Sequence, residues 1–162
     1  MSHARAWLPS QRGMVLLISL GLLLSLTLAA VSAAQTTVLE LRMARNGRDA
    51  TIAFHAAEAA LSEAESAIVA GTVSPLSPPA YGAAPPWQSH DWPDSDSAYI
   101  VEAVATVGEP PSSQIAVFRV TARGQGPGGA VAWLQTTYGR SNAAGADPRM
   151  TGRLSWVALP AW

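Results

Sequence analysis

The run of 21 uncharged residues from Met14 to Ala34 constrains this chain more than any other feature. It contains eight leucines, one isoleucine and two valines. A helix of this length rises roughly 31 Å, about the thickness of a bilayer core. Each large aliphatic side chain favours insertion by about 0.3–0.6 kcal/mol. We therefore expect residues 14–34 to form a single-pass transmembrane helix.

A cleaved secretory signal is the alternative interpretation of this run. The apolar core of such a signal is usually about 7–15 residues long, shorter than the run here. Val31-Ser32-Ala33 and Ser32-Ala33-Ala34 nevertheless carry the small residues that signal peptidase requires. Under this alternative, the mature protein is a periplasmic ligand-binding domain that begins near Ala34. Arginines flank the run on both sides, so the charge pattern does not set its orientation.

Residues 35–70 predict the amphipathic second half of the same helix. Apolar residues recur there at steps of mostly three or four between charged ones, and residues 10–74 contain no proline. Asn46-Gly47 is the weakest internal point, where we expect the helix to bend, fray or separate into two pieces, because glycine costs about 1 kcal/mol relative to alanine. Gly71 is expected to end the helix. A signal anchor with a stalk, or a coiled-coil helix, would share this pattern.

The rest of the chain predicts a connector followed by a small sheet. Residues 71–97 are rich in proline and serine and are expected to form the connector. Strands are expected at 98–107, 114–123 and 130–138, with a short edge strand at 154–159. Glycine- and proline-rich segments between them predict hairpins. The predicted fold class is α+β, a long N-terminal α-helix packed on a small antiparallel β-sheet of residues 98–162.

Composition argues against several functions. The net charge is −1, with ten arginines and no lysine, and no basic block suggests direct nucleic-acid binding. The absence of cysteine excludes disulfides. The three histidines are scattered, so we expect no catalytic residue, no cofactor and no enzymatic activity.

Three motifs have a possible ligand interpretation. Gly124–Gly129 is expected to be a turn rather than a phosphate loop, because it precedes a strand. Asp91, Asp94 and Asp96 predict a solvated acidic loop, since their spacing lacks the glycine and glutamate of an EF-hand, although calcium binding stays open. His55 and Glu58 are half of a helical metal site and are expected to be ordinary helix surface. No metal site is therefore predicted.

Tryptophans and glutamates suggest contacts with partners. Trp133 and Trp156 are expected in the core, whereas Trp87, Trp92 and Trp162 are equally compatible with exposure and partner contact. The helix glutamates are expected to pair with arginines of a neighbouring subunit: Glu58, Glu63 and Glu65.

Two blocks on the helix, Thr36–Ala44 and Phe54–Glu65, resemble the N-terminal region of PilX-type minor pilins of type IV pili. The resemblance extends from about Gln11, and Phe118–Gly124 and Arg153–Trp156 resemble PilX-type C-terminal sequence. In such proteins prepilin peptidase cuts after the glycine that ends the leader. The resemblance thus implies a leader over residues 1–13, cleavage after Gly13 and N-methylation of Met14. It also implies helix-assembly roles for four residues: Ile18, Phe54, Glu58 and Leu61.

Ile18 departs from the common pilin pattern, which has a glutamate at this fifth mature position. A carboxylate there is costly in the membrane unless it meets a partner, usually proposed to be the N-terminal ammonium of a neighbouring subunit. Ile18 has no such charge. We therefore hypothesise that this subunit enters early and lies at or near the filament tip.

The resemblance implies a minor pilin that takes part in assembly and initiation and is incorporated in low copy. Implied partners are other minor pilins, the major pilin, a tip adhesin-like protein, the inner-membrane assembly platform and prepilin peptidase. The implied location is the inner membrane, with the C-terminal domain in the periplasm, and then the pilus fibre. Twitching motility and adhesion would follow from the pilus. A pseudopilin of a type II secretion system is a further alternative.

Overall fold

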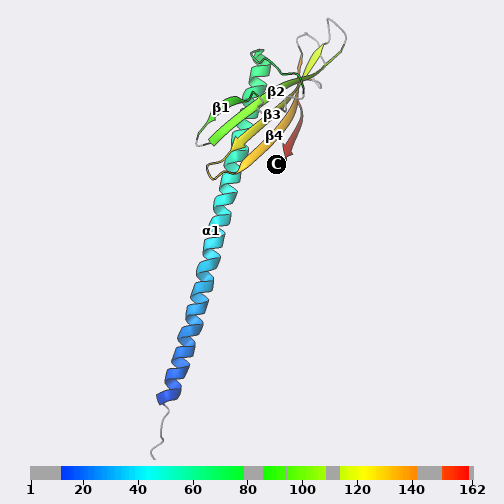
Figure 1. Ribbon diagram of the computed structural model, residues 1–162. Helices are drawn as coiled ribbons and strands as arrows, with labels where there is room; N and C mark the ends of the chain where they lie inside the picture. The colour runs from blue at the N-terminus through cyan, green and yellow to red at the C-terminus, as the bar shows by residue number, and fades with distance from the viewer. Residues whose placement is uncertain (1–11, 79–85, 94, 109–113, 142–150, 161–162) are drawn as a thin grey trace, which may run out of the picture. The chain divides into compact units, whose positions relative to one another are not determined.

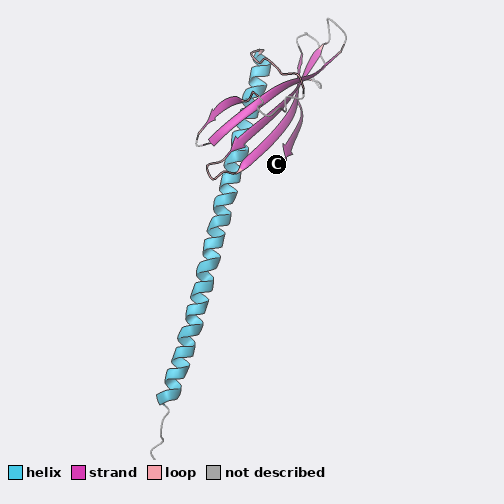
Figure 2. Cartoon of the chain, viewed as in Figure 1, coloured by secondary structure: helices cyan, strands magenta, loops and turns pink. Residues whose placement is uncertain are grey.

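The computed structural model describes residues 12–78, 86–93, 95–108, 114–141 and 151–160. Helix α1 (Arg12–Ala70) is followed by β1 (Gln88–Trp92), β2 (Ser95–Val107), β3 (Ile115–Gln125), β4 (Val131–Ser141) and β5 (Gly152–Leu159) (Figures 1 and 2). The chain divides into two compact units, Met1–Ala44 and Arg45–Trp162. We call residues 12–44 the N-terminal segment and the unit from Arg45 the C-terminal domain.

Helix α1 begins at Arg12, two residues before the expected start, and ends at Ala70 as predicted. Asn46 and Gly47 are both helical, so they do not separate two helical pieces. The end of the helix is a Schellman cap: the Gly71 amide donates to the Ile68 carbonyl at 3.2 Å and the Thr72 amide to the Ala67 carbonyl at 3.1 Å. Gly71 has a φ of 72°, a conformation that glycine adopts without strain.

The strands form one antiparallel sheet in the order β1-β2-β3-β4-β5. This confirms the predicted meander and the short C-terminal edge strand. The connector expected over 71–97 is partly wrong, because β1 lies inside it and β2 begins at Ser95. The residues of β1 are mostly polar and lack the apolar alternation that marks a strand; backbone pairing with β2 forms it instead. Leu76 adds a parallel bridge to Glu102.

The predicted turn at Gly124–Gly129 is confirmed. The Gly126 amide donates to the Ala130 carbonyl at 2.8 Å, and the Gly129 amide donates to the Gly126 carbonyl at 3.0 Å. Gly129 has a φ of 92°, which explains a glycine there. Gly124 itself belongs to β3. The other predicted reversal, Gly108–Pro111, lies mostly outside the described residues.

The core lies between α1 and one face of the sheet. The helix contributes a stripe of alanines with Leu61 and Ile68, spaced three or four residues apart. The sheet contributes larger residues: Tyr99, Val101, Phe118, Val120 and Leu134. Small helix residues let the helix lie close to the strands. At Gly124 the approach is so close that a Cβ would overlap the Ala53 carbonyl oxygen and the Ala57 backbone nitrogen.

Candidate functional site

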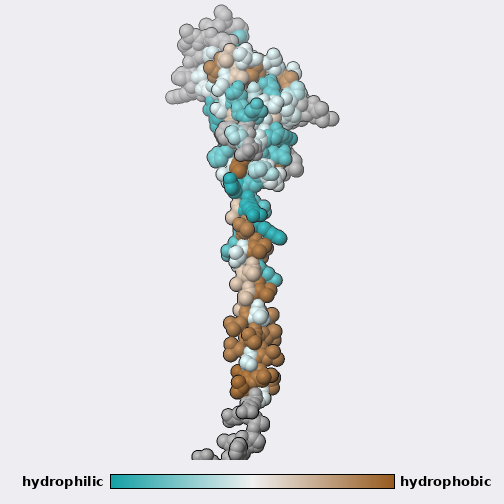
Figure 3. Space-filling view, turned by 90° about the vertical axis from the view of Figure 1, so that its left-hand side faces the viewer, coloured by the Kyte–Doolittle hydropathy of each residue, from teal (hydrophilic) through white to brown (hydrophobic). Residues whose placement is uncertain are grey.

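Residues 14–34 of the N-terminal segment carry no charge and present a mostly apolar surface. Every large apolar residue from Met14 to Val31 has 55–73% of its surface exposed within this chain. Figure 3 shows hydrophobic side chains on the visible side of the helix here, in the part of α1 coloured blue in Figure 1. The helix is long and apolar enough to cross a membrane. This segment therefore has an apolar surface that its own chain does not cover.

Three hydroxyl groups within the apolar run of this segment donate to carbonyl groups of the helix itself. Ser19 Oγ donates to the Leu16 carbonyl at 2.9 Å, Ser25 Oγ to the Gly21 carbonyl at 2.8 Å, and Thr27 Oγ1 to the Leu24 carbonyl at 2.8 Å. In an apolar environment an unpaired hydroxyl is costly. These bonds make the segment compatible with lipid or with other apolar helices.

The predicted processing residues lie at the start of α1. Gly13 has open space around its Cα, and Met14 is 63% exposed. Ile18 is also exposed and offers an apolar side chain at its position. Residues 1–11 of the predicted leader lie outside the described residues.

The other three predicted assembly residues contact the chain's own domain. Leu61 is fully buried in the core, so its side chain is unavailable to another subunit. Half-buried Phe54 packs edge-to-face on Trp156, with 6.2 Å between ring centroids. Glu58 Oε1 accepts a hydrogen bond from Trp156 Nε1 at 2.7 Å. These contacts hold β5 against the helix.

Arg153 joins β5 to two glutamates of α1. Its Nε and Nη2 donate to the two carboxylate oxygens of Glu65 at 2.8 and 3.2 Å, and its Nη1 lies 3.8 Å from Glu58 Oε2. The hydrogen bond to Glu65 is the main cause that raises the pKa of Arg153. Glu58 and Glu65 were expected to pair with arginines of a neighbouring subunit, whereas here they pair with Arg153 of their own chain. Sequence spacing gave no sign of it, because the partners lie 88 residues or more apart.

Asp49 binds the glycine-rich turn between β3 and β4. Its two carboxylate oxygens accept hydrogen bonds from the Gly128 amide at 2.6 Å and the Ala130 amide at 2.7 Å. A Cβ at Gly126 would overlap Asp49, so the glycine leaves room for the carboxylate. The turn therefore does bind an anion through backbone amides, but the anion belongs to the same chain.

The acidic loop is organised as a hairpin. Asp91 and Asp96 pair across β1 and β2, and Asp96 Oδ2 accepts a hydrogen bond from Arg123 Nη2 at 2.8 Å. Asp94 lies outside the described residues. Among the described residues, no three histidines or carboxylates come together as metal ligands would. His55 is exposed, and its ring makes an edge contact with Phe54.

The tryptophans differ from expectation. Trp156, predicted in the core, is 42% exposed and lies over Phe54. Trp133 is half-buried, and its ring centroid lies 5.5 Å from that of Trp87 in a T-shaped contact. Trp87 is thus packed within the domain. Trp162 lies outside the described residues.

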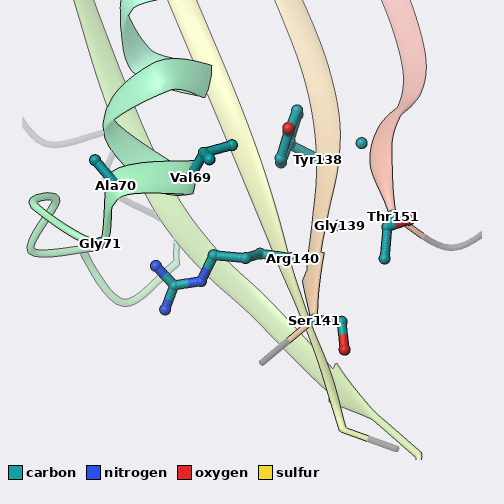
Figure 4. A pocket seen from close by; sticks show the side chains of 9 residues that line it. Val69, Ala70, Gly71, Tyr138, Gly139, Arg140, Ser141 and Thr151 are labelled. Carbon is teal, nitrogen blue, oxygen red and sulfur yellow. The ribbon is translucent and has the colours of Figure 1, made fainter. Parts of the chain in front are cut away.

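A cavity of about 490 Å³ lies at the end of α1. Figure 4 shows Arg140 extending from β4 toward the last turn of the helix, near Ala70 and Gly71. Arg140 Nη1 donates to the Ile68 carbonyl at 2.7 Å, and its guanidinium carbon lies 5.7 Å from the centre of the Phe118 ring. A cation at a helix C-terminus is favourable. We interpret Arg140 as a second cap for the helix.

Together, a long apolar N-terminal helix and a small antiparallel sheet covered by the second half of that helix define an α+β pilin-like fold. Residues 12–62 match the family model described as PilX N-terminal. The matched residues include both the apolar run and the first part of the domain helix. No curated protein and no solved structure shows a significant match to the chain.

Proposed function

We propose that this protein is a minor pilin of a type IV pilus that helps initiate assembly and enters the fibre in low copy near its tip. The observation that carries this proposal is the apolar surface of the N-terminal segment, joined to a domain with its own core. Burying one large aliphatic side chain gains about 1.5–3 kcal/mol. Lipid would cover this surface before assembly, and helices of other subunits would cover it in the fibre.

Maturation would begin with prepilin peptidase, which cuts between Gly13 and Met14 and leaves Met14 to be N-methylated. The C-terminal domain would lie in the periplasm until assembly. The proposed partners are other minor pilins, the major pilin, a tip adhesin-like protein and the inner-membrane assembly platform. Twitching motility and adhesion would then be properties of the whole fibre, not of a catalytic group in this chain.

Ile18 supports the tip position. In most pilins a glutamate at this place would pair with the N-terminal ammonium of a neighbouring subunit. Ile18 has no charge for that pairing, and its exposed side chain offers only apolar contact. A subunit without the charge has no need of a preceding one, so it suits the first positions. Leu61, Phe54 and Glu58 would contribute indirectly, by holding the domain on its helix.

The first experiment is to determine the mature N-terminus by mass spectrometry in cells with and without prepilin peptidase. We expect a methylated Met14 that depends on the peptidase. An N-terminus near Ala34 or Gln35 would contradict the proposal, because the helix needed for assembly would be lost. Sheared fibres should contain the processed protein at far lower abundance than the major pilin.

The tip position is tested by Ile18→Glu, with Ile18→Leu as the control. We expect Ile18→Leu to assemble normally and Ile18→Glu to change the number of pili or the position of the subunit along them, read by immunogold labelling. Unchanged assembly and position with Ile18→Glu would refute the role of the missing charge. That result would not affect the proposal that the chain is cleaved after Gly13.

A further inference from the structure

The two edges of the sheet differ in length and chemistry. Edge strand β1 has five residues, which include the polar side chains of Gln88, Ser89, His90 and Asp91. Edge strand β5 has eight residues, Gly152–Leu159, and most are apolar. Short length and charge are two ways in which proteins protect an edge from pairing with another chain. By these criteria β1 is protected and β5 is not.

Strand β5 is exposed along most of its length. Leu154, Trp156 and Val157 have 37%, 42% and 45% of their surface exposed. The one charged residue of the strand, Arg153, is held by Glu65 and Glu58 of α1 and is not directed at a partner. The first proline after the strand is Pro160, beyond its last paired residue. Among the described residues, β5 pairs with β4 on one side and with no strand on the other.

On the face of the sheet opposite the helix, β5 also presents apolar side chains. Val157 lies opposite Gln135 and Leu159 opposite Trp133 in the β4–β5 register. These positions alternate with Trp156, whose ring contacts Phe54 on the helix side. A strand added beside β5 would therefore meet apolar side chains on both faces.

We propose that the outer edge of β5 binds an extended segment of another fibre subunit as an additional antiparallel or parallel strand. Alternate residues of β5 have amide and carbonyl groups directed outward, and these would bind the added strand's backbone. The exposed side chains select an uncharged segment in which apolar residues alternate, since no free charge on β5 would attract a charged one. This inference rests on the proposed function, because the partner is a different subunit of the fibre. A second copy of this chain is disfavoured, since a low-copy subunit would seldom meet one.

Cross-linking tests the partner directly. The chain has no cysteine, so Val157→Cys introduces a unique thiol at the edge. The matched control is Val131→Cys, a valine of similar exposure (37%) that begins the interior strand β4. Each variant of the full chain is labelled with benzophenone maleimide in piliated cells, irradiated and analysed by mass spectrometry. The amount of labelled protein in sheared fibres is measured in the same samples.

We expect Val157→Cys to cross-link to one extended segment of one other pilus protein, at a yield about tenfold above the control. Equal yields, products scattered over many surfaces, or mainly dimers of this chain would each overturn the proposal. If the protein reaches the fibre and no such product forms, the edge proposal fails and the minor-pilin function stands. If the protein is absent from fibres, the minor-pilin function itself fails.

Hydrogen exchange provides a second measurement that does not depend on a variant. The outward amides of β5 should exchange about tenfold more slowly in fibres than in the detergent-solubilised subunit, because a strand hydrogen bond now protects them. The amides of β3, already paired on both sides, should change little. Equal exchange of β5 in both states would overturn the proposal.

Discussion

The two halves of α1 belong to the same helix, but only the second half buries its apolar residues within the chain. In residues 13–44 every side chain is exposed within the chain, although most are apolar. In residues 45–70 a stripe of alanines with Leu61 and Ile68 is fully buried against the sheet. A helix that is apolar all round needs an apolar environment from outside, whereas a one-sided stripe is matched by a single partner surface. The first half therefore depends on other molecules, and the second half on its own chain.

Truncating a large apolar side chain in each half of the helix is expected to give the largest difference in domain stability. Leu61→Ala should lower the free energy of unfolding of the C-terminal domain by about 2–5 kcal/mol, because Leu61 is fully buried. Leu23→Ala, at a position 61% exposed, should leave it unchanged. Denaturant unfolding of the full chain in detergent, followed by tryptophan emission, measures both. A loss below about 1 kcal/mol for Leu61→Ala would contradict the core described here.

A glycine pair tests how closely the second half approaches the sheet. Gly124→Ala should destabilise the domain by about 1–3 kcal/mol, because the added methyl group would overlap the backbone of Ala53 and Ala57. Gly47→Ala has open space and should stabilise the helix by about 1 kcal/mol. Thermal unfolding by circular dichroism should show shifts of opposite sign. Shifts of the same sign would mean that the helix lies farther from β3.

The contact between Asp49 and the turn is expected to have a smaller effect. Asp49→Asn should cost about 1–2 kcal/mol, because an amide offers one oxygen to two backbone donors. The control is Arg48→Gln, at an exposed neighbouring residue, with an expected change within about 0.5 kcal/mol. Hydrogen exchange at Gly128 and Ala130 should rise in Asp49→Asn alone. Equal exchange in both variants would show that Asp49 does not hold the turn.

The smallest expected effect is a loss of stability in alkaline solution. Burial, and then the negative charge of Glu63, raise the pKa of Tyr99 above its ordinary value of 10.0. Above that pH the unfolded chain loses the phenol proton while the folded chain retains it, so stability should fall as pH rises past about 10. Tyr99→Phe should reduce the fall, and Glu63→Gln should also make it smaller, because without the negative charge the pKa of Tyr99 in the folded chain lies closer to 10.0. Identical alkaline profiles for the wild type and Tyr99→Phe would contradict this cause.

Local patterns predicted most of the architecture. The apolar run, Gly71 and the alternating strands each carry their signal within a few residues, and the helix end, the meander and the β3–β4 turn are confirmed. Strand β1 was missed because its residues are mostly polar and lack the apolar alternation that marks a strand, although its backbone pairs with β2. The contacts of Asp49 with the turn and of Arg153 with Glu65 join residues about 80 or more positions apart, and no local pattern encodes them. The same is true of Glu58 with Trp156, which explains why Trp156 was misplaced in the core.

The close approach of the helix to Gly124 also affects how the domain responds to force. Sliding the domain helix by one turn, about 5.4 Å, would bring either Asp49 or Leu61 to a position now held by Ala53 or Ala57 against β3. Ala53 and Ala57 are fully buried where the helix backbone lies directly against Gly124, so either larger side chain would have to push the helix away from β3. The helix therefore resists sliding along the sheet. A force applied along the helix axis would act as a shear force on the whole domain and would not pull the helix out alone.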